Sequence, residues 1–501
     1  MNKPVPAIPI SRRGLLLGGT AIGGSLALGI RPGLGQISAP LLTVDTRVLE
    51  VNGKPAKVFK VAGPGGKSGI HAAEGDRFKG ALFNASADPL QMHWHGQIKA
   101  PFEQDRARPD GGMLAPGETD LHDFELTPGT HWMHSHTLTE QQLLAAPMIA
   151  REKSAGDVQD VVIMLHDFAF RSPDEILAEL GGSNAHGGHG GGHAGHGGHG
   201  GQGGHGAHAG HGGHAGDGGH AGHHSGHHGH SPGMIHANDV NYDAYLANDR
   251  TLGDPDVVRV EKGGRVRLRI INGGTATGFF ISTPGLKSEC VSVDGSPCLP
   301  VAADSYPLAQ GQRVDLIVTI PAGGGAFPVL AQVEEARFVT GIVLATAGAT
   351  IAKLPLEAET PQPLIDARFE ARLKATVPLP AKRPDKTFHV RLGEEPNYRW
   401  TINGRIHGEH VPFEARLGER VELMFMNPTS MMHPMHLHGH HFQVIGIGRN
   451  RIAGPVRDTV IVPPHMPVTI AFDAIYKGSW FLHCHHLYHM ATGMMTEVRV
   501  S

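Results

Sequence analysis

A pattern of ten residues occurs three times in the sequence and restricts the chain to a repeated β architecture. Each copy begins with Gly, has Arg two residues later and ends with Asn nine residues after the Gly; the copies are Gly75 to Asn84, Gly263 to Asn272 and Gly418 to Asn427. Each encloses an alternating run such as Arg420 to Phe425, which is typical of a half-buried strand. Three copies of one strand-and-turn unit predict three related β-sandwiches.

The chain length agrees with this count. A domain usually has roughly 100–200 residues, so a chain of 501 residues has room for three. We place the three β-sandwich domains at residues 37–155, 156–350 and 351–501. Helical periodicity is scarce, and Pro173 to Leu180 is the clearest short helix. The fold class that we predict is therefore all-β.

The spacing of the copies points to an insertion. The first two copies lie 188 residues apart and the last two 155, and the longer interval holds segment 186–230, with 15 of the 37 histidines. This segment is little but Gly, His and Ala, so it lacks core-forming side chains and we expect it to be disordered. Its many imidazoles are able to bind several metal ions. The alternative is a tolerated flexible loop, because long surface insertions cost little stability.

The N-terminal residues 1–36 have the features of an export signal. Arg12 and Arg13 precede a short apolar run, Leu15 to Ile30, which is rich in Gly. We interpret this as a twin-arginine signal peptide, cleaved near Gly35, because the run is too short and too Gly-rich for a membrane anchor. This predicts a partnership with the twin-arginine export machinery, a periplasmic or secreted location and no lasting membrane anchor.

Net charge excludes one class of partner. The formal charge is −4 and the pI is near 6.9. A chain with this balance has no basic footprint for a nucleic acid. Its partners must be inferred from its sites.

Four His-x-His pairs are the strongest functional signal. On a strand, residues i and i+2 project from the same face, so each pair presents two imidazoles together. Two pairs lie near each end of the chain, which predicts a metal site between the first and third domains. The eight residues are His93, His95, His134, His136, His436, His438, His483 and His485.

Cys484 lies between two of these histidines and therefore projects from the opposite face of its strand. With His433, His489 and Met494 it completes a His₂Cys set with a thioether, which is the ligand set of a blue electron-transfer copper. A buried structural Cys does not account for the surrounding histidines. Zinc is disfavoured because it typically forms compact tetrahedral sites.

These motifs resemble the four copper signatures of the multicopper oxidases. The segments that carry the resemblance are His93-Trp94-His95-Gly96, His134-Ser135-His136, His433-Pro434-Met435-His436-Leu437-His438-Gly439 and His483-Cys484-His485 with its continuation to Met494. The resemblance implies three cupredoxin-like Greek-key domains and four copper ions. It assigns type 2 copper to His93 and His436, one type 3 copper to His95, His134 and His485, the other to His136, His438 and His483, and type 1 copper to His433, Cys484, His489 and Met494.

The resemblance also implies a mechanism. A substrate gives single electrons to the type 1 copper, and Cys484 with its neighbours His483 and His485 carries them to the other three coppers, where dioxygen becomes water. Asp110 matches a carboxylate near the cluster in the family and is predicted to assist proton delivery; the alternative is an Asp-Gly turn residue. The stretch after His489 lacks the carboxylate that many relatives have there.

The identity of the reducing substrate has three interpretations. Nine of the sixteen methionines lie near the predicted type 1 site, and soft sulfur favours Cu(I), so we favour a cuprous oxidase for copper detoxification, supplied by segment 186–230. Thr429 and Ser430, however, occupy a stretch that is acidic in periplasmic cuprous oxidases. A laccase-like enzyme would oxidise phenols at an exposed edge of His489 or His433. A copper storage protein would have no turnover.

Two further cysteines flank a hairpin-turn signal, Asp294-Gly295. With a two-residue loop, Cys290 would face Leu299 rather than Cys298. A three-residue loop would align the two cysteines. Export makes a disulfide chemically possible, and the sequence leaves this bond open.

Overall fold

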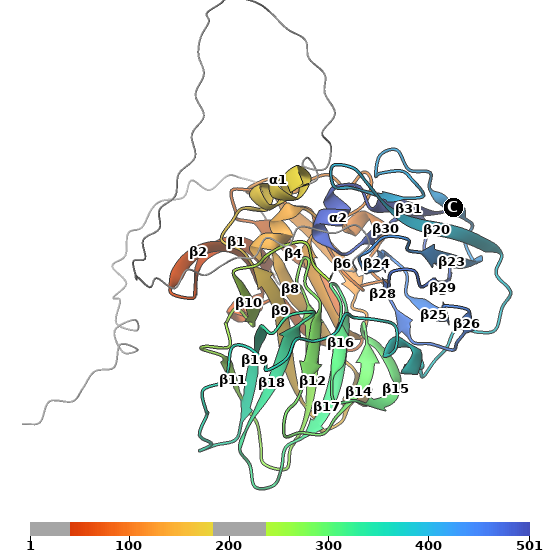
Figure 1. Ribbon diagram of the computed structural model, residues 1–501. Coiled ribbons are helices and arrows are strands. Elements are labelled where there is room, and N and C mark those ends of the chain that lie inside the picture. The colour runs from red at the N-terminus through yellow and green to blue at the C-terminus, as the bar shows by residue number, and fades with distance from the viewer. Residues whose placement is uncertain (1–40, 184–236) are drawn as a thin grey trace, which may run out of the picture. The chain divides into compact units, whose positions relative to one another are not determined.

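The computed structural model describes residues 41–183 and 237–501 (Figure 1). The predicted signal peptide, residues 1–36, and the His-rich segment 186–230 lie outside the described residues. Strands dominate the described part of the chain, and they form six sheets that combine into three sandwiches. The predicted helix at Pro173 to Leu180 is confirmed as α1 (Pro173–Ser183), and a short helix α2 (Leu487–Ala491) follows Cys484.

The first sandwich pairs sheet β2-β1-β4-β6 with sheet β3-β8-β7-β5. Apolar side chains from both sheets fill its core, including those of Leu42, Phe78 and Met133. Its strands are β1 (Leu41–Val51), β2 (Lys54–Ala62), β3 (Ile70–Ala73), β4 (Arg77–Asn84), β5 (Met92–His93), β6 (Thr119–Glu125), β7 (Gly129–Ser135) and β8 (Ala145–Arg151).

The second sandwich pairs sheet β10-β9-β12-β17-β14-β15 with sheet β11-β19-β18-β13-β16. Its core includes Leu268, Leu316 and Ile342. Its strands are β9 (Gln159–Phe168), β10 (Ala244–Ala247), β11 (Asp256–Arg259), β12 (Arg265–Asn272), β13 (Phe279–Ser282), β14 (Ser288–Val293), β15 (Ser296–Ala302), β16 (Tyr306–Leu308), β17 (Arg313–Thr319), β18 (Ala326–Val333) and β19 (Val339–Ala345).

The third sandwich pairs sheet β21-β20-β23-β29-β25-β26, with β27 attached to β25, and sheet β22-β31-β30-β24-β28. Its core includes Leu423, Phe442 and Cys484. Its strands are β20 (Lys386–Glu395), β21 (Arg399–Ile402), β22 (Phe413–Ala415), β23 (Arg420–Met426), β24 (His433–Leu437), β25 (Phe442–Ile447), β26 (Asn450–Arg451), β27 (Val456–Arg457), β28 (Thr459–Val462), β29 (Val468–Asp473), β30 (Gly478–Cys484) and β31 (Met495–Val500).

The sequence repeat corresponds to one strand in each sandwich. Strands β4, β12 and β23 each pair in parallel with an earlier strand (β1, β9 and β20) and antiparallel with a later one (β6, β17 and β29). In the facing sheets, β3 with β8, β11 with β19 and β22 with β31 also pair in parallel. The prediction of three related β-sandwiches is confirmed. The domain boundaries at 155/156 and 350/351 remain predictions.

The Asn that closes each repeat has the same role in all three copies. The side-chain amide of Asn272 donates to the carbonyls of Thr277 and Leu308, both at 2.9 Å, and its oxygen accepts from the N–H of Gly274. Asn84 and Asn427 make the equivalent bonds. Because each Asn is buried, it supplies partners that the turning backbone would otherwise lack.

The hairpin β14–β15 has the two-residue turn Asp294-Gly295, with Val293 opposite Ser296. A bulge between Cys290 and Ser292 changes the register, so that Cys290 pairs with Val301. The sulfur atoms of Cys290 and Cys298 nevertheless lie 3.9 Å apart, as two free thiols in the core. The two sulfur atoms are thus close together although the loop has two residues rather than the three that we expected the alignment to need.

No helix in the described ranges is both long and apolar enough to cross a membrane.

Candidate metal centre

Strand register brings the four His-x-His pairs together. In the first sandwich β5 and β7 are antiparallel neighbours, and His93 lies opposite His134. In the third sandwich β24 and β30 are neighbours, and His436 lies opposite His483. All eight histidines are at most 5% exposed. Each pair of neighbouring strands therefore presents four imidazoles in one buried region.

The imidazoles of the two sandwiches meet through their ring nitrogens. His93 Nε2 lies 3.2 Å from His436 Nε2, and His136 Nε2 lies 3.2 Å from His483 Nε2. His438 Nε2 is 3.0 Å from the same His483 atom. The first contact joins the predicted type 2 pair, and the other two join one predicted type 3 trio.

The second predicted trio has a different orientation. Nδ1 of His95, rather than Nε2, faces Nε2 of His134 at 3.4 Å. The ring centroid of His485 lies 5.0 Å from that of His134 and 5.2 Å from that of His95. Neither ring nitrogen of His485 has a hydrogen-bond partner among the described residues, although the side chain is buried. A buried polar group of this kind is costly unless something binds it.

The protonation of these rings suits metal binding. Burial lowers the pKa of His483 to about 3 and holds the pKa of His136, His438 and His485 well below the ordinary value. The rings are therefore neutral at physiological pH and have free lone pairs. Several neutral imidazoles with converging nitrogens are a donor set for a transition metal such as copper. The residues present thus fit metal ions of that class.

Three carboxylates that the sequence did not reveal hold the outer nitrogens of these rings. Asp105 Oδ2 lies 2.7 Å from His93 Nδ1, Glu140 Oε2 lies 3.1 Å from His134 Nδ1, and Asp458 Oδ1 lies 3.0 Å from His95 Nε2. Such partners fix the orientation and tautomer of metal-binding histidines. None of the three has a sequence signal, because Asp105 and Asp458 lie between regular elements and Glu140 lies in a short 3-10 helix (Leu138–Gln142), so none follows a periodic pattern.

Asp110 does not occupy the predicted position. Its side chain is 79% exposed and pairs with Arg108, whose Nε lies 3.1 Å from Asp110 Oδ1. The carboxylate of this loop that contacts a cluster histidine is that of Asp105, which is buried. The loop therefore turns Asp105 inward and leaves Asp110 in solvent, as expected of the Asp-Gly turn alternative.

A second group of ligand atoms surrounds Cys484, on the other face of β30. Its sulfur lies 3.6 Å from His433 Nδ1 and 3.7 Å from His489 Nδ1, and these two nitrogens are 3.2 Å apart. Burial raises the pKa of the Cys484 thiol, so the thiolate needs a cation to form. Met494 is fully buried, and its backbone carbonyl accepts from the N–H of Cys484 at 3.0 Å.

The two groups are joined along β30. Cys484 belongs to the second group and its sequence neighbours His483 and His485 to the first. His483 Nδ1 also donates to the carbonyl of Cys484 at 2.9 Å. A covalent path and a hydrogen bond therefore connect the thiol to the histidine cluster.

The histidines beside Cys484 are covered. His433 and His489 are 0% exposed, so neither has the exposed edge that the laccase-like interpretation expects. The rings of Trp400 and His486 both stack on the ring of His489, and their centroids lie 3.9 Å and 3.7 Å from its centroid. Asp239 Oδ2 lies 3.6 Å from His489 Nε2.

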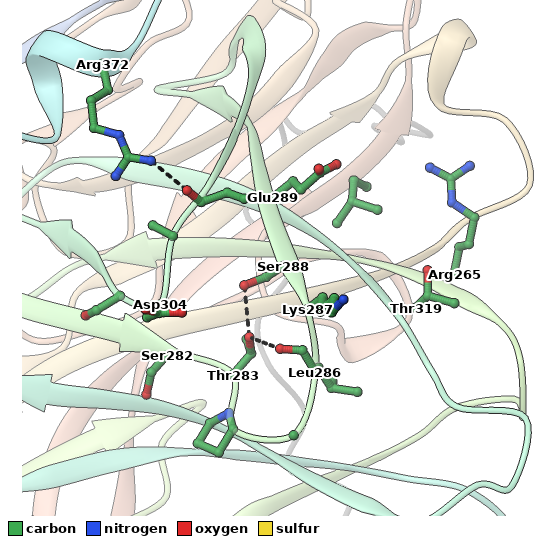
Figure 2. Close-up of a pocket in the computed structure, with 16 residues that line it drawn as sticks. Arg265, Ser282, Thr283, Leu286, Lys287, Ser288, Glu289, Asp304, Thr319 and Arg372 are labelled. Carbon is green, nitrogen blue, oxygen red and sulfur yellow. Dashed lines mark hydrogen bonds between the residues drawn. The ribbon is translucent and has the colours of Figure 1, made fainter.

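A cavity of about 1020 Å³ contains none of the predicted site residues. It lies in the second sandwich and is lined by charged residues that include Arg265, Lys287 and Arg372 (Figure 2). The histidine groups are thus not the floor of this open cavity.

Three family models, each described as multicopper oxidase, match residues 43–154, 220–350 and 379–501. The chain belongs to the multicopper oxidase family. It is therefore an oxidoreductase that uses copper and couples oxidation of a reducing substrate to reduction of dioxygen.

Individual relatives of this multicopper oxidase are named for several functions. Multicopper oxidase MmcO of Mycobacterium tuberculosis is 28% identical, over 86% of this chain and 80% of the relative. Copper resistance protein A of Escherichia coli is 24% identical, over 97% and 98%. Among solved structures, Fet3p, a multicopper oxidase that functions in iron import, has a TM-score of 0.71 at 16% identity, over 92% of this chain and 90% of that one. The laccase from Botrytis aclada has a TM-score of 0.70 at 21% identity, over 92% and 87%.

Proposed function

We propose that this multicopper oxidase binds four copper ions at the two groups of ligand atoms and oxidises Cu(I). The eight cluster histidines would hold three ions, and Cys484 with His433, His489 and Met494 would hold the fourth. When bound, copper supplies one-electron redox chemistry and the reduction of dioxygen. The converging neutral nitrogens and the buried thiol support this assignment.

The protein's own part is to hold and connect the two groups. Asp105, Glu140 and Asp458 keep the outer nitrogens of three rings occupied, so that the inner nitrogens stay available. Cys484 and His483 provide the path between the groups. Asp105 takes the place of Asp110 as the carboxylate that we propose for proton delivery, because it is buried beside His93.

The burial of His489 is the observation on which we choose Cu(I) over a phenol as the proposed substrate. A phenol would need an open ring edge, and His433 and His489 are fully buried. A small cation needs only a charged contact, and Asp239 supplies a buried carboxylate within 3.6 Å of His489 Nε2 and 3.2 Å of His486 Nε2. We propose that Cu(I) delivers its electron by way of Asp239 and His489.

Methionines contribute less directly than the sequence suggested. Met431 and Met435 are buried in the core of the third sandwich and Met432 is buried in a neighbouring cluster. Thr429, in the stretch where periplasmic cuprous oxidases have an acidic residue, places its hydroxyl 2.9 Å from His433 Nε2. The relatives named copper resistance protein A support copper as the substrate.

The location and the role of the His-rich segment complete the proposal. We propose that residues 1–36 direct twin-arginine export to the periplasm, where segment 186–230 collects copper. The segment precedes Asp239 by only nine residues. Copper collected there would be released close to the proposed entry point.

Oxygen uptake with Cu(I) and with a phenol, measured under matched conditions, tests the proposal. We expect faster uptake with Cu(I), a loss of Cu(I) turnover in Asp239→Asn, and little change in Asp243→Asn, which alters an exposed carboxylate nearby. Deleting 186–230 should slow uptake only at low copper. Phenol turnover far above Cu(I) turnover would instead favour a laccase-like enzyme, and full copper loading without oxygen uptake would favour storage.

A visible spectrum tests the copper assignment separately. The copper-loaded protein should be blue, because a thiolate bound to Cu(II) absorbs strongly in the visible range. Cys484→Ser should remove the colour and leave the histidine cluster loaded. A colourless wild-type protein with full copper content would contradict the assignment.

A further inference from the structure

Asp458 contacts one predicted copper ligand from each of two sandwiches. It lies between β27 and β28 and is 1% exposed. Its Oδ1 atom is 3.0 Å from Nε2 of His95, which belongs to the first sandwich. Its backbone carbonyl accepts from Nδ1 of His436, in the third sandwich, at 2.8 Å. A single residue thus orients two histidines that the sequence separates by more than three hundred positions.

The contact with Asp458 explains the unusual orientation of His95. The four Nε2 atoms of His93, His436, His136 and His483 meet in pairs. His95 instead turns Nδ1 toward His134, because its Nε2 is held by Asp458. A carboxylate accepts a hydrogen bond and so favours the tautomer with the proton on Nε2. In that tautomer Nδ1 has the free lone pair that a metal requires.

Arg313 holds Asp458 in turn. Arg313 begins strand β17 of the second sandwich and is 0% exposed. Its Nη1 donates to Asp458 Oδ1 at 2.7 Å and its Nη2 to Oδ2 at 2.5 Å, which is a bidentate pair. Its Nε also donates to the carbonyl of Thr130 in the first sandwich at 3.1 Å. The second sandwich, which supplies none of the predicted ligands, therefore reaches the cluster through this guanidinium.

The Gly that ends the first histidine motif leaves room for this pair. Gly96 has a φ of +82°, and a Cβ atom there would lie 2.2 Å from His131 Nδ1, 2.7 Å from Arg313 Nη2 and 2.9 Å from Asp458 Oδ2. All three distances are shorter than a side-chain carbon tolerates. The motif His93-Trp94-His95-Gly96 thus encodes a ligand and also the space that its positioning partner occupies.

We infer that Arg313 and Asp458 form a positioning pair that holds His95 and His436 ready for copper. The inference rests on the proposed copper assignment and goes beyond it, because it gives the second sandwich a role in the oxygen-reducing site. Neither residue is proposed to bind metal. Their effect is on the orientation of two ligands, and losing such a partner typically lowers metal affinity about 10–100-fold.

Asp458→Asn and Arg313→Lys test the pair. Asn keeps the size of Asp458 but lacks its negative charge and replaces Oδ2, the acceptor of Arg313 Nη2, with an NH₂ group that only donates. Lys keeps the charge of Arg313 but cannot bind bidentately. We expect a 10–100-fold loss of copper affinity at the histidine cluster in Asp458→Asn and a smaller loss in Arg313→Lys. Copper per chain in chelator competition and the electron paramagnetic resonance of type 2 copper measure this, and the blue colour of the Cys484 site should stay unchanged.

Glu370→Gln is the matched control. Glu370 is a buried acid and pairs with no predicted ligand. It accepts a hydrogen bond at 2.9 Å from Nε of Arg457, the residue that precedes Asp458 in the sequence. Thermal unfolding of the metal-free variants measures how far each change loosens the fold. The inference holds if Asp458→Asn lowers cluster affinity and alters the type 2 signal while Glu370→Gln, at similar stability, does neither.

Two outcomes would overturn the inference. In the first, the wild-type protein is blue and fully loaded, and Asp458→Asn keeps its copper affinity and type 2 signal. In the second, Glu370→Gln lowers cluster affinity as much as Asp458→Asn, so that the effect is a general loosening. A wild-type protein without cluster copper would overturn the proposed function as well, and the wild-type copper content alone reveals that case.

Discussion

Nδ1 of His93 lies 2.7 Å from Oδ2 of Asp105, and both side chains are buried. Asp105 Oδ1 also accepts from the N–H of Ala107 at 2.9 Å, so the carboxylate has a fixed position in its loop. The ring of His93 is therefore held with Nε2 toward His436. This relationship distinguishes two carboxylates of one loop, Asp105 and Asp110, only the first of which contacts the cluster.

Replacing Asp105 should impair the enzyme much more than replacing Asp110. Asp105→Ala removes the acceptor of His93 Nδ1, and we expect turnover or type 2 copper affinity to fall about 10–100-fold. Asp110→Ala removes only an exposed ion pair with Arg108 and should change turnover less than twofold. Steady-state oxygen uptake and the copper content of both variants show which of the two carboxylates the enzyme needs. A larger effect at Asp110 would restore the prediction made from the sequence.

Asn272→Ala should destabilise the second sandwich. The change leaves the buried carbonyls of Thr277 and Leu308 and the N–H of Gly274 without their partner. An unsatisfied buried group costs about 1–3 kcal/mol, so we expect the free energy of unfolding to fall by roughly 2–4 kcal/mol. Urea unfolding of the metal-free protein measures this.

Asn272→Asp provides the control for that loss. Asp keeps the oxygen that accepts from Gly274 but loses the two donors, so it should destabilise nearly as much as Ala. A loss below about 0.5 kcal/mol in both variants, the range of ordinary surface changes, would show that the repeated Asn is not needed for stability.

The sequence was sufficient for features that depend on local periodicity. Alternation along a strand predicted which side chains share a face, and this gave the eight cluster histidines and the opposite projection of Cys484. The closing Asn of each repeat likewise predicted three equivalent strands. Asp458 and Arg313 lacked such a signal, because their contacts join different sandwiches. The cover over His489 also depends on Trp400 and Asp239, which come from distant parts of the chain.

The proximity of Cys290 and Cys298 could not be predicted from regular strand pairing across the hairpin. With the two-residue turn at Asp294-Gly295, ideal pairing sets Cys290 opposite Leu299. A bulge instead places Cys290 opposite Val301, and its sulfur lies 3.9 Å from that of Cys298. A bulge inserts unpaired residues and turns a side chain. Its position was not evident from the hairpin signal.

We predict that Cys290 and Cys298 form a disulfide when the unfolded chain refolds with an added small-molecule disulfide. The two thiols lose two protons and two electrons, and the added disulfide is reduced to two thiols. Intact mass should fall by two hydrogens, and thermal unfolding should show a stabilisation of up to about 2.5 kcal/mol for so short a loop. Cys290→Ser and Cys298→Ser should show neither change. Three free thiols in the oxidised, refolded wild type, instead of the single thiol of Cys484, would contradict the prediction.

Glu334 should make stability fall as pH rises above about 4.5. It is 4% exposed, and burial raises its pKa from 4.5 to about 8, although its Oε1 accepts from the N–H of Ile365. Between these values the folded state binds more protons than the unfolded state, so the free energy of unfolding decreases with pH. The stabilisation from protonated Glu334 is fully present below pH 4.5, its unfolded pKa, and is lost as the pH rises from there through about 8, its folded pKa. One unit of pKa is worth about 1.4 kcal/mol, so the loss attributable to Glu334 is of the order of 5 kcal/mol. Urea unfolding of the metal-free protein from pH 4 to 9 should show a flatter profile in Glu334→Gln. Glu335→Gln should stay close to the wild-type profile, because the charge of this exposed neighbour raises the pKa of Glu334 less than burial does. Equal slopes in all three proteins would show that Glu334 is ionised in the folded state at neutral pH.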